Sequence, residues 1–599
     1  MIYMEEIMAF QRIEYTADLC VVGGGLAGMC AAIAAARGGS RVVLIQDRPV
    51  LGGNASSEIR MWVCGADGHN NRETGIIEEI QLASLWRNPD KNYSIWDGIL
   101  YEKVRFEKNI TLLLNCSVCD AEMENGQIKS VTGWQTTTQK WHTVKATYFA
   151  DCSGDSVLAP LTGADFRVGR EAASEFGEKT SQVEEDRQTM GMSCLIQLRK
   201  SDRVTEYIPP EWAMKMTPEV IKLRKPHMEN SSENFWYMEL GGNRDSIGDT
   251  EELRDELVSM AYGMVDYIKN SGEVEDGPYW ELEFLGFLPG KRESRRMMGA
   301  YLMTQNDVLA GGDFPDTVAF GGWPLDDHHP DGFYHAGNPN VWGKTPAPYG
   351  IPYRCLYSRN VPNLYFAGRN ISMTHAAMSS ARVMATCALL GEAVGEAANV
   401  AREFGLTPHG VYEEKLDLLQ QRLMEHGCFL PRFARTISDV CRNAALTGEA
   451  DRLDVLRDGI DRNNHTYGEE DHSTVLPLGK AVTYTFDAPV QLANIHLAFD
   501  SDLDRATMPG DWCEKRHSMR ANRTAESPTM WMPKTLVKGY RLTAVTASGE
   551  TVTLAETERN LLQCVNIPAD GAYTAVTFVP LSTWDDGAES ACVFSFDLR

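Results

Sequence analysis

The sequence lacks the features that mark membrane-spanning, secreted and nucleic-acid-binding proteins. No window reaches the roughly 18 uninterrupted apolar residues that a membrane span requires. The N-terminal segment is acidic rather than basic and has no long apolar core, so we expect no secretory signal. Positive charge is also scarce, because 57 Lys and Arg stand against 83 Asp and Glu, a net charge of −26. This balance argues against nucleic acid or an anionic membrane as a main partner.

The cysteine pattern of a disulfide framework is also missing. The 14 cysteines are scattered, and several lie inside apolar segments, which is typical of reduced thiols in a cytoplasmic protein. Cys116 and Cys119 have CxxC spacing, but they end a run of strand character, where the two side chains should point to opposite faces. We therefore expect a cytoplasmic protein and favour packed thiols over a redox pair at this position.

A chain of 599 residues is long enough to predict two or three domains. The pattern of strand-like and helix-like segments changes along it. Strand-like and helix-like segments alternate first, give way to long mixed segments, and return with the strand "NLYFAGRN" and one long helix that opens at His375. A second amphipathic helix is expected at about 411–426. The expected units are an α/β domain in two parts (14–163 and 355–405), an inserted domain (164–354), a helical connector (406–445) and an all-β unit (446–599).

The clearest motif is a glycine turn between an apolar strand and an alanine-rich helix. The strand 19–22 runs directly into Gly23-Gly24-Gly25-Leu26-Ala27-Gly28, which is GxGxxG in the required context. Gly23 permits the tight turn, Gly25 lets the backbone approach a pyrophosphate, and Gly28 lets the helix pack closely on the sheet. The helix N-terminus offers N–H groups and a positive dipole end to the diphosphate. We therefore expect a bound dinucleotide.

The second strand of this unit, residues 41–45, ends where an acidic ribose ligand is usual, and here the residue is Gln46. Its amide can bond ribose hydroxyls without the strength of a charge-assisted bond, and Asp47 next to it offers a carboxylate. The sequence leaves both residues as ribose ligands.

Three further segments decide between FAD and NAD. "RPVLGGNASSE" follows the second strand, and its Gly52-Gly53 pair allows close backbone contact beyond the ribose. "ATYFADCSGDSV" resembles the "ATG(D)" segment of flavoproteins, and "VPNLYFAGRNIS" resembles their C-terminal flavin segment. That likeness implies that the helix after it points its N-terminus at the pyrimidine edge of the flavin, where negative charge develops on reduction.

Together with "LGGNASSEIRMWVCGADGHNNRETG", "GKRESRRMMGAYLMTQNDV" and "VAFGGWPLDDHHPDGF", these segments resemble the glutathione-reductase-like FAD fold. More closely, they resemble a bacterial family of FAD-dependent oxidoreductases often associated with carbohydrate use. The resemblance covers about 16–427 and implies an α/β, Rossmann-like FAD-binding domain with an inserted α+β substrate domain. It does not specify the substrate. The residues expected to hold FAD are Gly23, Gly25, Gly28, Gln46, Asp47, Gly52, Gly53, Asn54, Gly154, Asp155, Gly368, Arg369 and Asn370.

No second GxGxxG occurs in a strand–turn–helix context, which argues against a built-in NAD(P)H domain. We therefore expect the flavin to be reduced by the substrate itself or by a separate donor. A separate electron acceptor is the corresponding partner for the oxidising direction.

Oxidising an alcohol needs a base for the hydroxyl proton, and histidine suits this role near neutral pH. His375 opens the long helix and should lie near the flavin ring, unless it only bonds backbone at the helix start. His328 and His329 lie in "GGWPLDDHHPDGFYHAGNPN", a loop whose aromatic and acidic residues suit a sugar-like ligand. The same loop could bind a metal, but its spacing matches no ligand pattern, so no metal is predicted.

Arginines complete the set of candidate catalytic residues. Arg60, with Cys64, His69 and Arg72, follows the glycine pair and could line the substrate face of the flavin. Cys64 has no nearby partner cysteine, so a packed thiol is favoured there. Arg292 in "KRESRRMMG" could clamp an anionic substrate or the reduced flavin, or form salt bridges within its own charged segment.

The C-terminal region alternates apolar and polar residues at Val482, Tyr484 and Phe486, and again at Ile495, Leu497 and Phe499. It resembles a galactose-binding-like β-sandwich, which implies either sugar binding or a packing role. The leading hypothesis is an FAD-dependent dehydrogenase of a hydroxyl-bearing small molecule, such as a sugar, glycoside or sugar acid. Two alternatives remain: a flavin-dependent reductase of an activated double bond, and a sugar-binding or assembly protein with a structural flavin. The sequence leaves the oligomeric state open.

Overall fold

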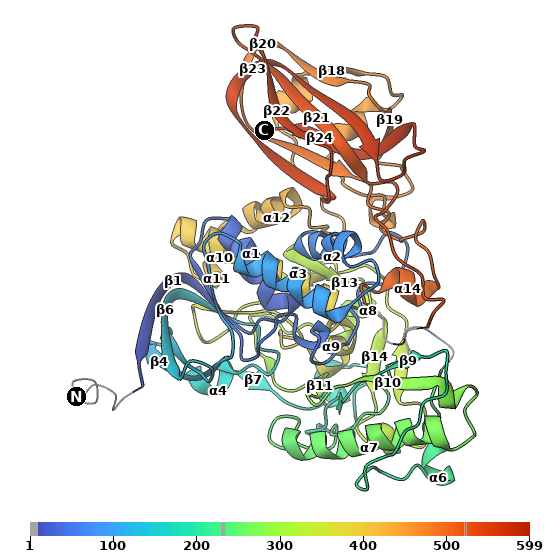
Figure 1. The fold of residues 1–599 in the computed structure, drawn as a ribbon. Helices are drawn as coiled ribbons and strands as arrows, with labels where there is room; N and C mark the ends of the chain where they lie inside the picture. The colour runs from blue at the N-terminus through green and yellow to red at the C-terminus, as the bar shows by residue number, and fades with distance from the viewer. Residues whose placement is uncertain (1–9, 229–233, 520–521, 523) are drawn as a thin grey trace, which may run out of the picture.

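The computed structural model describes residues 10–228, 234–519, 522 and 524–599. Figure 1 shows the C-terminal β region at one end, a central α/β body, and the inserted region around helix α7 (Thr250–Asn270) at the opposite end. The expected fold class is confirmed: a mixed α/β domain with a parallel sheet, and an antiparallel β-sandwich at the C-terminal end.

The central body is built on a seven-stranded sheet. β1 pairs in parallel with β2 and β6, β3 pairs in parallel with β2, and β17 lies parallel to the end of β6. The carboxyl ends of five parallel strands therefore meet at one edge, which is where ligands bind in open α/β sheets. The strands are β1 (Arg12–Val22), β2 (Val42–Ile45), β3 (Ile110–Leu113), β4 (Cys116–Glu124), β5 (Gln127–Gln135), β6 (Lys140–Asp151) and β17 (Leu364–Phe366).

Two helices cover this sheet in close contact with each other. α1 (Leu26–Arg37) and α10 (Met384–Phe404) pack through glycine and alanine. A Cβ on Gly391 would lie 1.9 Å from the Ala27 carbonyl oxygen, and one on Gly395 would lie 2.3 Å from that of Ala31. Such contacts leave no room for a larger side chain on α10.

The long helix expected from His375 onward is two helices, so that prediction was wrong. α9 (His375–Ala381) and α10 meet at 96°. The break has a tertiary cause: the Ala385 N–H donates to the Cys64 carbonyl oxygen, and the Arg382 guanidinium donates to Asp326. Residue 383 is extended and forms the N-cap of α10. The bent pair is also the only length of helix among the described residues with the length and apolarity of a membrane span, and no single helix reaches both.

The helix expected at about 411–426 is also divided. α11 (Pro408–Glu414) and α12 (Leu416–Glu425) meet at Lys415, whose φ of −137° is not helical. Its ammonium group lies 4.3 Å from the centre of the Phe404 ring at the end of α10. On β4, Cys116 is buried and Cys119 is exposed, as expected for side chains on opposite faces.

The inserted region packs around its own apolar core beneath α7. Its longest strands, β9 (Ile196–Lys200) and β10 (Trp280–Leu285), form an antiparallel pair. The remaining strands form two-stranded sheets: β7 (Phe166–Arg167) with β12 (Arg296–Met297), β8 (Met192–Ser193) with β11 (Gly290–Lys291), β13 (Thr317–Gly321) with β16 (Tyr349–Pro352), and β14 (Leu325–His328) with β15 (Asn340–Gly343).

The C-terminal sandwich depends on two long strands. β20 (Val482–Phe499) pairs with β23 (Cys564–Thr583) along most of its length, with register shifts at 485/490 and 492/494. One half of β20 also pairs with β18, and the other half with β24. The two runs of alternating residues seen in the sequence, 482–486 and 495–499, thus belong to one strand. The other strands are β18 (Ala445–Gly448), β19 (Thr474–Pro477), β21 (Val537–Thr546), β22 (Thr551–Thr557) and β24 (Ser590–Leu598).

The remaining helices are short or lie on the surface of the α/β body. They are α2 (Ile76–Arg87), α3 (Tyr93–Arg105), α4 (Leu158–Thr162), α5 (Ala173–Phe176), α6 (Pro218–Ile221), α8 (Gln305–Leu309), α13 (Asp439–Asn443) and α14 (Trp512–Arg516). α14 belongs to the long connection between β20 and β21, which leaves the sandwich and reaches the α/β body (Figure 1).

Candidate functional site

The turn between β1 and α1 is closed on its inner side and open on its outer side. A Cβ on Gly23, whose φ is +105°, would lie 2.4 Å from the Cys152 carbonyl oxygen. The Cβ position of Gly25, by contrast, has only the Gly53 Cα within 4 Å, at 3.9 Å. Gly25 is also the N-cap of α1, and no side chain caps this helix. The first-turn N–H groups and the open backbone therefore fit a diphosphate.

Gln46 braces this turn from inside and does not face a ligand. Its Oε1 accepts a hydrogen bond of 2.7 Å from the Gly24 N–H, and its Nε2 donates to the Val50 carbonyl oxygen at 3.2 Å. The side chain is buried, so both ends of the amide are used within the protein. Of the two ribose candidates, Asp47 has the accessible group, a carboxylate that is 61% exposed.

The predicted cofactor residues from four segments meet at the carboxyl edge of the sheet. Arg369 Nη2 donates to Asp155 Oδ1 at 2.6 Å, and Lys291 Nζ lies 2.9 Å from Asp155 Oδ2. Asn54 Nδ2 donates to the Lys291 carbonyl oxygen at 3.1 Å. The Arg369 guanidinium fills the space beside Gly154, where a Cβ would lie 2.3 Å from it.

Within the part of the chain that the structure describes, Arg369 Nε and Asn370 Oδ1 are buried at this edge without a hydrogen-bond partner. Asn370 also donates to Asp151 and Ser156, so its carbonyl oxygen is held in a fixed direction. Buried polar atoms are normally paired, and those left unpaired in a fixed position fit a polar ligand. The donor set, the diphosphate turn and the unpaired atoms together fit FAD.

The start of α10 supplies the open helix N-terminus expected near the flavin. α10 runs parallel to α1, with Gly391 against Ala27, so Met384 begins roughly 10 Å beyond the glycine turn. No side chain caps α10. The expected position, His375, does not offer free N–H groups, because Thr374 and Glu171 accept from the first turn of α9. Of the two helices, α10 is the one whose first turn meets no side-chain acceptor, and there the Ala385 N–H donates to the Cys64 carbonyl oxygen.

His375 lies buried between two carboxylates. Its Nδ1 is 2.8 Å from Glu293 Oε2, and its Nε2 is 3.0 Å from Asp327 Oδ1. Burial opposes the charged imidazolium, but the two carboxylates outweigh it and raise the pKa of His375 to about 10. Asp327 is the outer member, with a side chain 24% exposed against 6% for His375. Although burial disfavours its charge, the His375 imidazolium holds the pKa of Asp327 below its usual value.

His328 forms a second buried cluster next to the first. Its Nδ1 lies 2.6 Å from Glu239 Oε2, and its Nε2 lies 3.3 Å from Asp326 Oδ1. Burial lowers the pKa of His328, but Glu239 and Asp326 reverse this and raise it. Arg292 Nη1 is 3.4 Å from Glu239, and Arg382 Nη2 is 3.2 Å from Asp326. Arg292 therefore belongs to an internal salt-bridge network rather than to a free anion clamp.

His329 lies apart from this network. Its ring stacks on His335 with 3.6 Å between centroids, and burial beside His335 lowers the pKa of His329. Among the described residues, the His, Cys, Asp and Glu ligand atoms that converge within 4.8 Å belong to His329, Asp331 and His335. The cluster considered from the sequence, Asp326 to His329, does not converge as a whole: His328 pairs with Asp326, but Asp327 pairs with His375 and His329 with Asp331.

Arg60 lies on the edge of the site, where its φ is +65°. Its Nη1 donates to Gln197 Oε1 at 2.7 Å, and its guanidinium lies 4.0 Å from the centre of the Phe284 ring. His69 and Arg72, expected at the substrate face, instead bind the C-terminal part of the chain. His69 pairs with Asp504, and Arg72 donates to the Leu503 and Arg516 carbonyl oxygens.

An aromatic cluster beside the start of α10 was not predicted. Trp62, Cys64 and Val383 pack together with Trp236 and Trp323. Burial raises the pKa of Cys64 to about 12, which agrees with a packed thiol. The residues come from four distant segments, so only the tryptophans in "RMWVCG" and "GGWPLDD" hinted at them.

The carboxylate partners of the two histidines were also missed. Glu239 and Glu293 lie in the inserted region, where their segments carry no local pattern that distinguishes them from surface acids. The signal that could have marked Glu293 is its place in "GKRESRRMMG", between arginines of a segment already taken as part of the resemblance.

Comparison with known proteins gives a family and several remote structural likenesses. The profile of a family described as FAD dependent oxidoreductase matches residues 18–423. No curated protein matches the chain.

Among solved structures, a geranylgeranyl bacteriochlorophyll reductase-like protein from Thermoplasma acidophilum is similar at 13% identity and a TM-score of 0.31, covering 69% of this chain and 86% of its own. The FAD complex of glycerol-3-phosphate dehydrogenase from Bacillus halodurans is similar at 16% identity and a TM-score of 0.18, and the match covers 25% of this chain and 37% of that one. The family 32 carbohydrate-binding module of Streptococcus pneumoniae EndoD is similar at 9% identity and a TM-score of 0.20, and the match covers 27% of this chain and 99% of that module. Likenesses this remote carry no argument about activity or ligand.

Proposed function

This chain belongs to the FAD dependent oxidoreductase family, and on that premise we propose that it oxidises a hydroxyl group of a sugar, glycoside or sugar acid. When bound, FAD supplies the two-electron acceptor that takes the hydride at flavin N5. The observation that supports this proposal most is the Asp327–His375 pair, since the neighbour of Asp327 in sequence, Asp326, binds Arg382 just before the start of α10.

The chain's own residues hold the cofactor at one end of the site. In our proposal the Gly25 and Gly53 backbone and the first turn of α1 bind the diphosphate, and Asp47 binds the ribose. Arg369, Asn370 and the start of α10 lie beyond the diphosphate and bind the flavin half. The α10 dipole favours the negative charge that develops on reduction.

Proton removal falls to Asp327. Its lowered pKa keeps the carboxylate ionised at neutral pH, and it is the member of the pair that a substrate can reach. The hydroxyl proton passes to Asp327 as the C–H hydride leaves, and a carbonyl product forms. His375, held in place by Glu293, orients Asp327 and stabilises its charge. His375 and His328 have carboxylates on both ring nitrogens, so neither offers a free nitrogen as base.

Anaerobic mixing of the purified holoprotein with a panel of sugars, glycosides and sugar acids tests this proposal. We expect bleaching of the oxidised flavin absorbance by at least one hydroxyl compound, together with a carbonyl product in equal amount. Full retention of oxidised flavin with every member of the panel, in protein that does hold FAD, would contradict it.

A second function, reduction of an activated double bond, is favoured by one observation. The pKa of His375, about 10, keeps the imidazolium protonated at neutral pH, which suits a proton donor more than a base. Chemically reduced holoprotein mixed with enone and enoate substrates separates the two. Rapid reoxidation by these compounds, without bleaching by any sugar, would replace the first proposal with the second.

A further inference from the structure

The C-terminal part of the chain contributes directly to the wall of the candidate site. The connection between β20 and β21 carries α14 (Trp512–Arg516) onto the α/β body, where His517 lies 5.3 Å from the Trp62 ring. Trp62 belongs to the aromatic cluster, together with Cys64. The carbonyl oxygen of Cys64 accepts a hydrogen bond from the Ala385 N–H at the start of α10. The sandwich and the flavin region therefore meet at the substrate side of the site.

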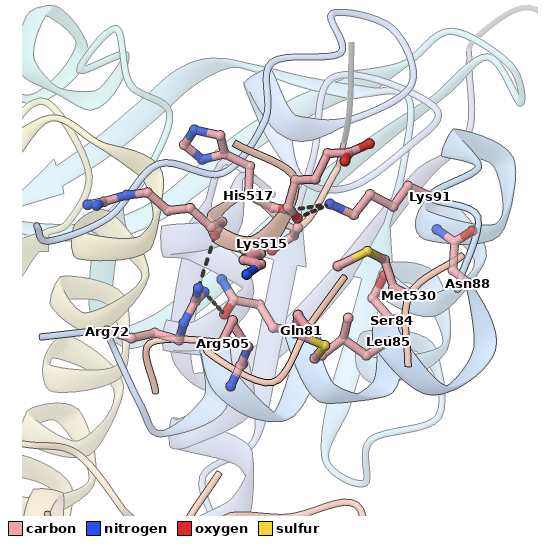
Figure 2. Close-up of a pocket in the computed structure, with 14 residues that line it drawn as sticks. Arg72, Gln81, Ser84, Leu85, Asn88, Lys91, Arg505, Lys515, His517 and Met530 are labelled. Carbon is pink, nitrogen blue, oxygen red and sulfur yellow. Dashed lines mark hydrogen bonds between the residues drawn. The ribbon is translucent and has the colours of Figure 1, made fainter. Parts of the chain in front are cut away.

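α14 is held there by cations of the α/β body. Lys91 Nζ donates to the Glu514 and His517 carbonyl oxygens at 2.5 and 2.8 Å, and Arg72 Nη2 donates to that of Arg516 at 3.1 Å. Positive groups at a helix C-terminus satisfy its unpaired carbonyls and its dipole. Figure 2 shows Lys91 and Arg72 reaching these carbonyls from the α/β body.

Two further contacts fix this segment in place. Arg505 forms a two-pronged pair with Glu78, with 2.8 Å between the closest atoms and both side chains buried. Arg516 pairs with Asp67 and donates to the Ala66 carbonyl oxygen at 2.9 Å. A segment held by one buried ion pair and one partly exposed ion pair is part of the architecture of the site.

These contacts create a continuous strip of flat side chains across the boundary. The Arg516 guanidinium lies 5.3 Å from the centre of the Trp512 ring and 5.6 Å from that of Trp323. The Trp323 ring is in turn 5.8 Å from the Trp342 ring on β15. Trp512 and Trp342 are 59% and 55% exposed, which is a high exposed fraction for tryptophan.

Polar groups lie along the inner side of the strip. The Trp323 indole N–H points at Asp326 Oδ2 at 3.4 Å, and Arg382, whose buried Nε has no partner, binds the same carboxylate. Flat apolar faces that alternate with carboxylates and guanidinium groups suit a pyranose chain, which presents C–H faces to rings and hydroxyls to charges.

We propose that Trp512, Arg516, Trp323 and Trp342 form a binding strip for an extended glycan, so that the substrate is an oligosaccharide or a larger glycoside whose terminal unit enters the flavin site. The inference rests on the proposed oxidation of a sugar and specifies its substrate class. It also gives the C-terminal sandwich a role at the active site that depends on α14.

Isothermal titration of the holoprotein with gluco-, galacto-, manno- and xylo-saccharides of one, two and four units tests the strip. We expect one series to bind with an affinity that rises with chain length. Trp512→Ala and Trp342→Ala should each weaken binding of the tetrasaccharide on the order of tenfold and leave the single sugar nearly unchanged. Trp212→Ala is the matched control, since Trp212 is 57% exposed but packs on Tyr262 of α7.

Three outcomes would overturn the inference: no binding in any series, affinity independent of chain length, or an effect of Trp512→Ala without one of Trp342→Ala. Flavin bleaching, followed separately, tells its failure from that of the proposed function. Bleaching at the same rate for every chain length keeps sugar oxidation and rejects the strip. Length-dependent binding sensitive to both tryptophans, without bleaching by any sugar, keeps the strip and rejects sugar oxidation.

Discussion

Two histidines lie buried against carboxylates in different halves of the molecule, and their surroundings differ. His375 in the α/β body lies between Glu293 and Asp327, and His496 in the sandwich lies 3.3 Å from Asp461. The pKa of each is raised to about 10. For His496, burial and Arg435 act against this shift, while Cys564 and Asp461 raise the pKa.

The difference lies in how each cluster is completed. In the sandwich, the Arg435 guanidinium joins Asp461 and Asp597, so the connector, the loop at Asp461 and β24 are tied together by one buried cation. Around His375 and His328, two separate arginines pair with the carboxylates instead, Arg296 with Glu293 and Arg382 with Asp326. Among the described residues, buried atoms without a hydrogen-bond partner occur in both clusters, such as Glu239 Oε1 near His328 and Asp597 Oδ1 in the sandwich. A shifted pKa alone therefore does not mark a functional histidine, because structural networks shift pKa values too. A place near the carboxyl edge of the parallel sheet, within the region that matches the family, is the better sign.

The strongest test of this contrast removes the charge of the accessible carboxylate. Asp327→Asn keeps the shape and one acceptor oxygen but cannot take a proton, so we expect sugar-dependent flavin reduction to fall about 10²- to 10⁴-fold. FAD content and the melting temperature should stay close to those of the wild type. His496→Asn is the control in the other cluster, with a flavin reduction rate per folded molecule close to that of the wild type. Equal losses in both variants would remove the distinction between the clusters.

The next test breaks the structural cluster. Arg435 is 1% exposed and holds two carboxylates, so Arg435→Met leaves buried charges uncompensated and should cost about 3–5 kcal/mol of unfolding free energy. Urea unfolding followed by tryptophan fluorescence measures this loss. The flavin reduction rate of the molecules that remain folded should be unchanged. A loss below about 1 kcal/mol would show that Arg435 does not join the connector to the sandwich energetically.

The contrast also shows which features were predictable from the sequence. The glycine turn, the parallel strands and the residues at the carboxyl edge of the sheet could be predicted. Gly23 to Gly28, the apolar strand before them and Gly368 have local sequence patterns that few backbone structures satisfy. The position of the β-sandwich followed from alternation of apolar residues, although Val482 to Phe499 form one bent strand. The register shifts that bend it have no signature in a single sequence.

Features that depend on distant partners were not predictable. The break at residues 382–383 exists because Cys64 and Asp326 take bonds from the start of α10 and from Arg382. Helix propensity favours continuation there, so tertiary contacts decide. Likewise, Glu293 and Glu239 are distant in sequence from the histidines they bind. His69 and Arg72 were assigned to the flavin because no local pattern shows that residues beyond 500 fold back onto them.

A smaller effect is expected from pH. A raised folded-state pKa means that each histidine binds its proton more tightly in the folded chain, so it adds stability at low pH. That contribution is fully present below the unfolded value of about 6.5 and is lost as pH rises through about 10. Urea unfolding at pH 7 and pH 10 should show a decrease in the wild type and a smaller one in His375→Gln and in His496→Gln. A decrease as large in both variants as in the wild type would assign the alkaline loss to other groups.

The smallest effects are expected at the glycine turn, where Gln46 bonds within the protein and Asp47 is the candidate ribose ligand. Gln46→Ala removes the acceptor of the Gly24 N–H, a neutral bond worth about 1 kcal/mol, so FAD should bind roughly fivefold more weakly through a loosened turn. Gln46→Glu restores an acceptor and should recover most of this affinity. Asp47→Ala leaves the turn intact, and if Asp47 holds the ribose, a similar loss should appear that Gln46→Glu does not rescue. Dissociation of FAD followed by flavin fluorescence measures all of these variants. Full rescue by glutamate at 46 and a normal affinity in Asp47→Ala would assign the effect to the turn alone, and the ribose ligand would have to lie elsewhere at the sheet edge.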